Sequence, residues 1–187
     1  MYAVFRSAIM NYAGVLPRAV IALTMADLLF PGRDGAGIRE QVHFIEVQDG
    51  ESKTVLDRNV TFFDIESVKA RQFGFCMELG SGRKLTCCGD EPCREHAFAY
   101  AANSAWLLHE AFCREADADR YHPHRIQHST VKEACELAEQ LGVQNLLLYH
   151  TEDQNITDRK RLYSEEGRRY YSGRLYVPDD LETIRII

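Results

Sequence analysis

Between Thr130 and His150 the chain reads TVKEACELAEQLGVQNLLLYH, and this stretch decides the fold class. Thr130 is followed three residues later by Glu133, which makes a capping box, and apolar residues then recur at helical spacing. Gly142 ends the predicted helix, and the apolar run that follows is typical of a buried strand. A helix that leads directly into a buried strand predicts an α/β fold, in which helices cover a sheet.

The flanking sequence predicts strands before this stretch and mixed elements after it. The expected strands are Gln41–Val47, Lys53–Leu56, Val60–Ile65, Phe73–Leu79, Arg83–Cys88, Ala105–His109, Gln144–His150, Arg174–Val177 and Thr183–Ile186. The expected helices are Thr130–Leu141, Glu95–Ala102 and Thr157–Tyr171. Nearer the start, the patterns favour a helix with Val4–Tyr12 on its apolar face, a strand at Ala19–Leu23 and a helix at Thr24–Phe30.

Composition is that of an ordinary globular protein. The chain has 187 residues, of which 45% are hydrophobic, and 22 basic side chains stand against 28 acidic ones. A net charge of −6 argues against wholesale wrapping by nucleic acid, although a local basic patch remains compatible with it. Apolar runs stay short of the ~18 residues of a membrane span, so we expect a cytoplasmic protein whose six cysteines are reduced.

Three predicted strands end in residues that can bind metal or move protons. Asp90 follows the strand that ends at Cys88, His109 and Glu110 end the next strand, and His150 ends a third. In open α/β sheets the carboxyl ends of strands form the ligand-binding edge. Oxygen and nitrogen donors of this kind bind zinc or manganese. The alternative is that each residue only caps a helix or closes a turn.

His128 stands directly before the capped helix, with Ser129 between it and Thr130. A helix N-terminus favours an anionic ligand, so His128 is a candidate proton donor beside a phosphate or an oxyanion. His122 and His124 have the H-x-H spacing of some metal sites, but a polar loop that contains proline is more often simply exposed.

A basic stretch, Arg159–Arg174, carries six basic residues against two acidic ones, with tyrosines between them. Arg168 and Arg169 in this stretch could contact RNA phosphates while the tyrosines stack on bases. A solvated amphipathic helix explains the pattern equally well.

Taken together, these segments resemble ribonuclease Z-like hydrolases of the metallo-β-lactamase fold. The resemblance lies in four ordered motifs: Gly89–Pro92 (GDEP), Trp106–Cys113 (WLLHEAFC), His128–Thr130 (HST) and Leu146–Asp153 (LLLYHTED). It implies an αββα four-layer sandwich with two zinc ions, or manganese, at one edge. It also implies a metal-dependent phosphodiesterase of the tRNA 3′-processing type, with a tRNA precursor as substrate.

The resemblance assigns a role to individual residues. Asp90 resembles the carboxylate that bridges both metals, and His150 resembles the last histidine ligand. His128 resembles the general acid that protonates the leaving oxygen, with Glu110 orienting it. His109 is a further ligand candidate at the matching histidine–glutamate motif. The expected substrate-binding residues are Ser129, Thr130, Arg168 and Arg169.

Two departures from the family pattern affect the metal site. The signature H-x-H-x-D-H, which supplies most ligands, is absent from the sequence. The chain is therefore expected to be a single domain over residues 1–187, N-terminally incomplete, that starts just after this motif. A second ligand histidine is also missing, and Glu66 is the nearest candidate to replace it. Weak metal occupancy and weak activity are the expected consequences.

Other functions remain open at this point. A metal-free binding or scaffold protein of the same fold fits the missing signature, and a hydrolase of a small ester or thioester would share the metal chemistry. A nucleotide-binding α/β domain fits the stretch after Thr130, although no phosphate-binding loop supports it. A homodimer is also open.

Overall fold

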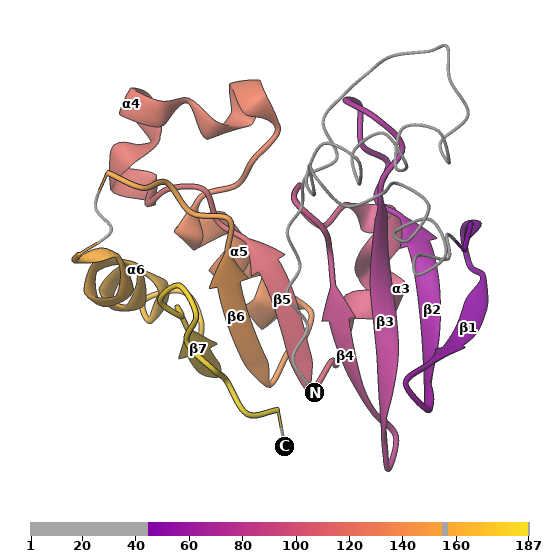
Figure 1. The fold of residues 1–187 in the computed structure, drawn as a ribbon. Coiled ribbons are helices and arrows are strands. Elements are labelled where there is room, and N and C mark those ends of the chain that lie inside the picture. The colour runs from indigo at the N-terminus through magenta and orange to yellow at the C-terminus, as the bar shows by residue number, and fades with distance from the viewer. Residues whose placement is uncertain (1–44, 155–156, 187) are drawn as a thin grey trace, which may run out of the picture. The chain divides into compact units, whose positions relative to one another are not determined.

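A computed structural model of the chain describes residues 45–154 and 157–186 (Figure 1). From Gln48 onward these residues form one compact unit. Its centre is a seven-stranded sheet in the order β1-β2-β3-β4-β5-β6-β7. The strands are β1 (Ser52–Val55), β2 (Arg58–Asp64), β3 (Phe73–Gly80), β4 (Arg83–Cys87), β5 (Trp106–Glu110), β6 (Asn145–Tyr149) and β7 (Arg174–Tyr176). The first four strands pair antiparallel, and β4 to β7 pair parallel.

Helices connect the parallel strands. They are η1 (Glu95–Ala97), α3 (Phe98–Ala101), η2 (Glu115–Asp117), α4 (Ala118–Tyr121), η3 (Pro123–Ile126), α5 (Val131–Gln140) and α6 (Arg159–Gly167). Figure 1 shows α4 beyond the arrowheads of β5 and β6, so the loop after β5 stands over the carboxyl edge of the sheet.

The main core lies between the sheet and helices α3, α5 and α6. Leu107, Leu146 and Leu148 from the parallel strands are almost fully buried there, together with Val131 and Ala134 from α5. A second cluster around Trp106 and Leu85 lies apart from it. Because both clusters draw on the parallel strands, the strand ends are held at fixed positions, as a site built on them requires.

Helix α5 begins where the capping box predicts. Thr130 accepts from the backbone of Glu133, and the Glu133 carboxylate accepts from the backbone N–H of Thr130 at 2.8 Å. The Glu133 carboxylate also lies 2.9 Å from Nε2 of His124. Burial alone would raise the pKa of Glu133, but the Thr130 N–H and His124 outweigh burial and lower it below the ordinary value of 4.5.

Most predicted elements are confirmed, with boundary shifts of a few residues. The strand expected at Thr183–Ile186 is wrong, because those residues are irregular, and the described end of the expected strand Gln41–Val47, residues 45–47, is irregular too. Helix α6 is shorter than expected and ends at Gly167. The elements expected at Val4–Tyr12, Ala19–Leu23 and Thr24–Phe30 lie outside the described residues. Of the two sheets in the expected sandwich, the described residues show one.

Two further observations concern the surface and the thiols. Within the described ranges, no helix is both long and apolar enough to cross a membrane. All six cysteines are free, and Cys88, Cys93, Cys113 and Cys135 are buried.

Candidate functional site

The parallel pairing of β4, β5 and β6 brings three predicted residues to one edge of the sheet. Cys87 of β4 pairs with Leu108 of β5, and Glu110 pairs with Tyr149 of β6. His150 comes directly after its paired position, and Asp90 comes three residues after Cys87. The residues nominated from three separate strand ends therefore share one edge, as the α/β pattern predicts.

Asp90 has a buried carboxylate oxygen without a hydrogen-bond partner in the described part of the chain. Gly89 before it has a positive φ of 81°, and a Cβ at that position would come within 3.1 Å of Ile65. The chain therefore turns sharply at a residue without a side chain. Among the described residues, the buried Oδ1 of Asp90 finds no hydrogen-bond partner. An unpartnered buried oxygen is costly unless something outside the protein chain binds it.

His150 lies beside His128 at the same edge. Its backbone φ is 54°, a left-handed conformation that costs about 1–2 kcal/mol for a residue with a Cβ. The two imidazole rings are tilted, with centroids 4.7 Å apart. Burial and the neighbouring His128 lower the pKa of His150, although Asp90 opposes them. At neutral pH His150 is therefore a neutral imidazole, the form that binds metals.

The ring of His128 contacts two other rings, and one of its nitrogens lies within ion-pair distance of a carboxylate. Its ring stacks on Phe112 with centroids 5.4 Å apart, and His150 lies against it as well. Nδ1 of His128 is 3.4 Å from Oε2 of Glu110, which is fully buried. This arrangement leaves Nε2 of His128 as the nitrogen available to a substrate.

Ser129 and Thr130 are buried and already hydrogen-bonded. Ser129 donates its backbone N–H and its hydroxyl to Oε1 of Glu110, at 2.7 and 2.6 Å. Thr130 donates its hydroxyl to Glu115 at 2.9 Å and caps α5. Both side chains support Glu110 and the helix, and the substrate-binding role predicted for them stays a prediction.

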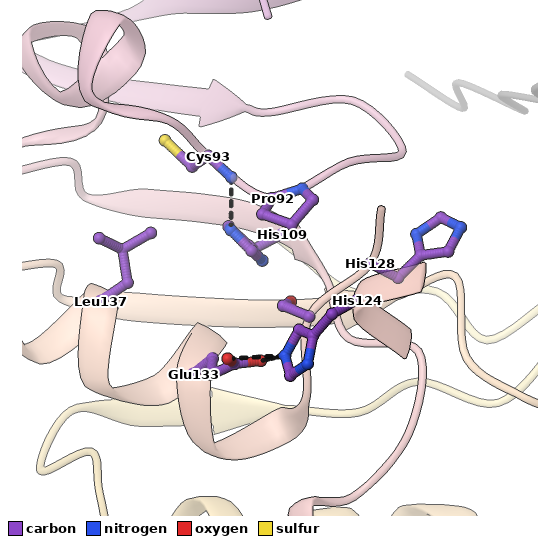
Figure 2. Close-up of a pocket in the computed structure, with 8 residues that line it drawn as sticks. Pro92, Cys93, His109, His124, His128, Glu133 and Leu137 are labelled. Atoms are coloured by element: carbon purple, nitrogen blue, oxygen red, sulfur yellow. Dashed lines mark hydrogen bonds and ion pairs between the residues drawn. The ribbon is translucent and has the colours of Figure 1, made fainter. Parts of the chain in front are cut away.

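Both ring nitrogens of His109 are hydrogen-bonded within the protein. Its Nε2 accepts from the backbone N–H of Cys93 at 3.0 Å, so its Nδ1 carries the proton and donates to the Glu110 carbonyl at 2.5 Å. With both nitrogens engaged, His109 has no free lone pair for a metal. His109 also borders a cavity of about 200 Å³, whose lining includes His124 and Glu133 (Figure 2). Figure 2 shows the ring of His128 turned away from the His124–Glu133 pair.

A buried ion-pair network that the sequence analysis missed joins three loops at this edge. Glu91, fully buried, accepts from the hydroxyl of Ser67 at 2.7 Å and from Arg94 at 2.9 Å. Arg94 also donates to Gln127 at 3.2 Å. Glu91 adjoins Asp90 and Gln127 adjoins His128, so the network ties both candidates together. The spacing of Glu91 and Arg94, three residues apart, was the available signal.

Three predicted residues are not brought to this group. Glu66 is exposed, and its backbone N–H bonds to Asp64 rather than its side chain reaching Asp90. Arg168 and Arg169 are exposed just beyond the end of α6. Since α6 connects the carboxyl end of β6 to the amino end of its parallel neighbour β7, its last turn lies at the opposite edge of the sheet.

The fit of this edge to a metal ion is partial. Asp90, with its unpartnered Oδ1, and His150, as a neutral imidazole, suit zinc or manganese. In the described part of the chain, however, no group of three or more His, Cys, Asp or Glu side chains is placed to hold a metal ion. These residues therefore supply part of a metal site.

Comparison with known proteins gives sequence relatives of one kind. Ribonuclease Z of Exiguobacterium sibiricum is 35% identical over 104 residues, which cover 55% of this chain and 34% of that protein. Ribonuclease Z of Myxococcus xanthus is 32% identical over 155 residues, or 80% of this chain and 45% of that protein. The chain thus spans less than half the length of these curated relatives. No family model matches it.

Solved structures give a consistent result. The metallo-β-lactamase fold protein YhfI from Bacillus subtilis superposes with a TM-score of 0.59 at 18% identity, over 79% of this chain and 59% of that one. The short form of human tRNase Z superposes with a TM-score of 0.53 at 21% identity, over 73% of this chain and 47% of that one. At such identities the likeness is one of fold.

Proposed function

We propose that this chain, which is similar in sequence to ribonuclease Z and shares the metallo-β-lactamase fold, acts as a metal-dependent hydrolase of phosphodiester bonds in RNA. The reaction class is that of tRNA 3′ processing. One observation carries the proposal: the buried, unpartnered Oδ1 of Asp90 lies at the same sheet edge as His150 and His128.

Asp90 and His150 are the residues that would hold the metal. When bound, a divalent ion supplies a Lewis acid, which offsets negative charge on the phosphate and lowers the pKa of water. Zinc is the first candidate and manganese the second, because the donors are one oxygen and one nitrogen. Catalytic zinc has three protein ligands, so the proposal requires further donors from outside residues 45–154 and 157–186.

His128 is the proposed general acid. Nδ1 faces Glu110 at 3.4 Å, so Nε2 is free to give a proton to the leaving oxygen of the scissile phosphate. Glu110 stabilises the imidazolium that this step requires and keeps the ring in one orientation. Phe112 packs against one face of the ring and keeps bulk water from that side.

The two alternative functions are supported to different degrees. A metal-free binding protein of the same fold is not favoured, because the relatives are named as ribonucleases. A small ester or thioester remains the alternative substrate, since the same metal chemistry attacks such bonds and the chain carries a net charge of −6.

The test combines metal retention with two substrates. The purified chain is equilibrated with Zn²⁺ or Mn²⁺ and dialysed, and its metal content is measured by mass spectrometry. Cleavage of a tRNA precursor with a 3′ extension and of a small ester is then followed. Asp90→Ala and His150→Ala should lose both retained metal and RNA cleavage, whereas the exposed control His96→Ala should keep both.

Two outcomes would count against the proposal. A wild-type chain that retains no metal and cleaves no RNA would remove it. Cleavage of the ester but not of the RNA would preserve the metal site and change the substrate class.

A further inference from the structure

The hydroxyl of Tyr149 joins the two strand ends that carry Asp90 and His150. Tyr149 is the last residue of β6 and directly precedes His150. Its hydroxyl donates a hydrogen bond to the carbonyl oxygen of Gly89, the residue directly before Asp90. One side chain thus links the backbone beside both proposed metal ligands.

This link spans a strand. Strand β5 lies between β4 and β6, and neighbouring strands are about 4.8 Å apart, so the outer two are separated by about 10 Å. Ladder hydrogen bonds connect each of them to β5 but not to one another. A long side chain with a polar tip is therefore required to connect the end of β6 directly to the end of β4, and Tyr149 provides it.

The hydroxyl of Tyr149 contacts both Gly89 and Cys87. The carbonyl oxygen of Gly89 accepts a hydrogen bond from it, and the sulfur of Cys87 lies 3.6 Å from it. These contacts lie around the left-handed turn at Gly89 that leads into Asp90.

The Asp90 carboxylate has little else to direct it. Within residues 45–154 and 157–186, Oδ1 of Asp90 is without a hydrogen-bond partner. The direction of the carboxylate is thus set by the backbone at Gly89. His150 follows directly after β6, so its backbone position depends on the end of that strand.

We propose that Tyr149 is a positioning residue, which sets the separation and orientation of Asp90 and His150 for metal binding. The inference rests on the proposed function, because it takes these two residues as metal ligands. Removing the hydroxyl releases Gly89 and lets the two ligands move independently. Groups that orient metal ligands in this way typically change metal affinity about 10- to 100-fold when they are lost.

The experiment compares Tyr149→Phe with the matched control Tyr171→Phe. Tyr171 is also buried, and its hydroxyl also donates to a backbone carbonyl, that of Val143 at 2.9 Å. Val143 precedes β6, so this second hydrogen bond lies at the opposite edge of the sheet. Both variants keep the ring and lose one hydroxyl, so a general effect on stability appears in both, as thermal unfolding will show.

The first measurement needs no metal. In NMR spectra of the labelled chain, Tyr149→Phe should shift the ¹³C carbonyl resonance of Gly89 and the backbone amide resonances of Asp90 and His150. Tyr171→Phe should leave these resonances in place. If Tyr149→Phe leaves them unmoved as well, the positioning role is overturned, whatever the metal data show.

The second measurement is zinc affinity by competition with a chromophoric chelator. We expect Tyr149→Phe to bind zinc about 10-fold or more weakly than the wild type, and Tyr171→Phe to match the wild type. Equal affinity in all three proteins would overturn the positioning role alone. A wild-type chain that binds no zinc would overturn the proposed function, while the NMR comparison would still decide whether Tyr149 links the strand ends.

Discussion

Replacing Glu110 by alanine should be among the most destabilising single changes at the site edge. Glu110 is fully buried, and its Oε1 accepts both the backbone N–H and the hydroxyl of Ser129. Alanine leaves the backbone N–H of Ser129 without its acceptor in the interior, whereas the Ser129 hydroxyl keeps the backbone carbonyl of Glu110, 3.1 Å away, as a second acceptor. The loss can therefore be worked out mainly from one named hydrogen bond.

The magnitude follows from the cost of the orphaned donor. A buried donor left unsatisfied costs about 1–3 kcal/mol, so the orphaned backbone N–H of Ser129 predicts a loss of about 1–3 kcal/mol in Glu110→Ala. Glu110→Gln should cost clearly less, because the amide oxygen can still accept from Ser129. Ser129→Ala removes one donor and keeps the backbone bond, so about 1–2 kcal/mol is expected.

The assay is urea unfolding of the metal-free chain, followed by circular dichroism. Glu110→Ala, Ser129→Ala and the double variant form a cycle, whose coupling energy should be about 1–3 kcal/mol, since the residues are in direct contact. Glu165→Ala is the control, because its ion pair with Arg161 is exposed and should matter little.

Two results would refute this reasoning. A Glu110→Ala variant within about 0.5 kcal/mol of the wild type would behave like a surface substitution. A coupling energy near zero would mean that Glu110 and Ser129 contribute independently, against the short contacts between them. In either case the account of how Glu110 holds the segment before α5 would be wrong.

Three further predictions test separate parts of the molecule. Glu91→Gln takes the carboxylate from Arg94 in a buried pair and should lower the free energy of unfolding by about 1–3 kcal/mol in urea titrations. The pKa of Glu133 is lowered in the folded state, so its stabilising contribution is present above the ordinary value of 4.5 and is lost as the pH falls through the folded-state pKa. The difference in free energy of unfolding between the wild type and Glu133→Gln should therefore shrink in acid. A difference that stays constant with pH would contradict this. Replacing Arg168 and Arg169 together by glutamine should leave kcat/KM for a small phosphodiester unchanged, because both lie at the opposite edge of the sheet.

The features predicted correctly from the sequence are those that local sequence signals determine. Helix α5 starts where the capping box places it, because its start depends on residues three positions apart. The α/β class and the metallo-β-lactamase fold were also predicted, the first from the alternation of helix and strand, the second from four ordered motifs. The position of Asp90 and His150 at strand ends was predicted because strand ends can be read from apolar runs, while their role as metal ligands stays a prediction.

The contacts that the sequence did not reveal are distant along the chain. The hydrogen bond from Tyr149 to Gly89 joins residues 60 positions apart, and that from Ser67 to Glu91 joins residues 24 apart. Such pairs depend on the order of strands in the sheet, which no local pattern encodes. The position of Arg168 could not be predicted for the same reason. A basic helix can be recognised from its residues, but only the crossover between parallel strands shows which edge of the sheet its last turn reaches.

His109 and Glu110 show how strand geometry divides roles between neighbours. Successive side chains of a strand point to opposite faces, so the two residues make different contacts. His109 uses both ring nitrogens within the protein, on Cys93 and on the backbone of Glu110. Glu110 instead supports Ser129 and faces His128. A histidine–glutamate pair at a strand end therefore supplies one residue to the protein interior and one to the proposed site. His109→Gln should lower the free energy of unfolding. Glu110→Gln should instead change how the ring of His128 is oriented.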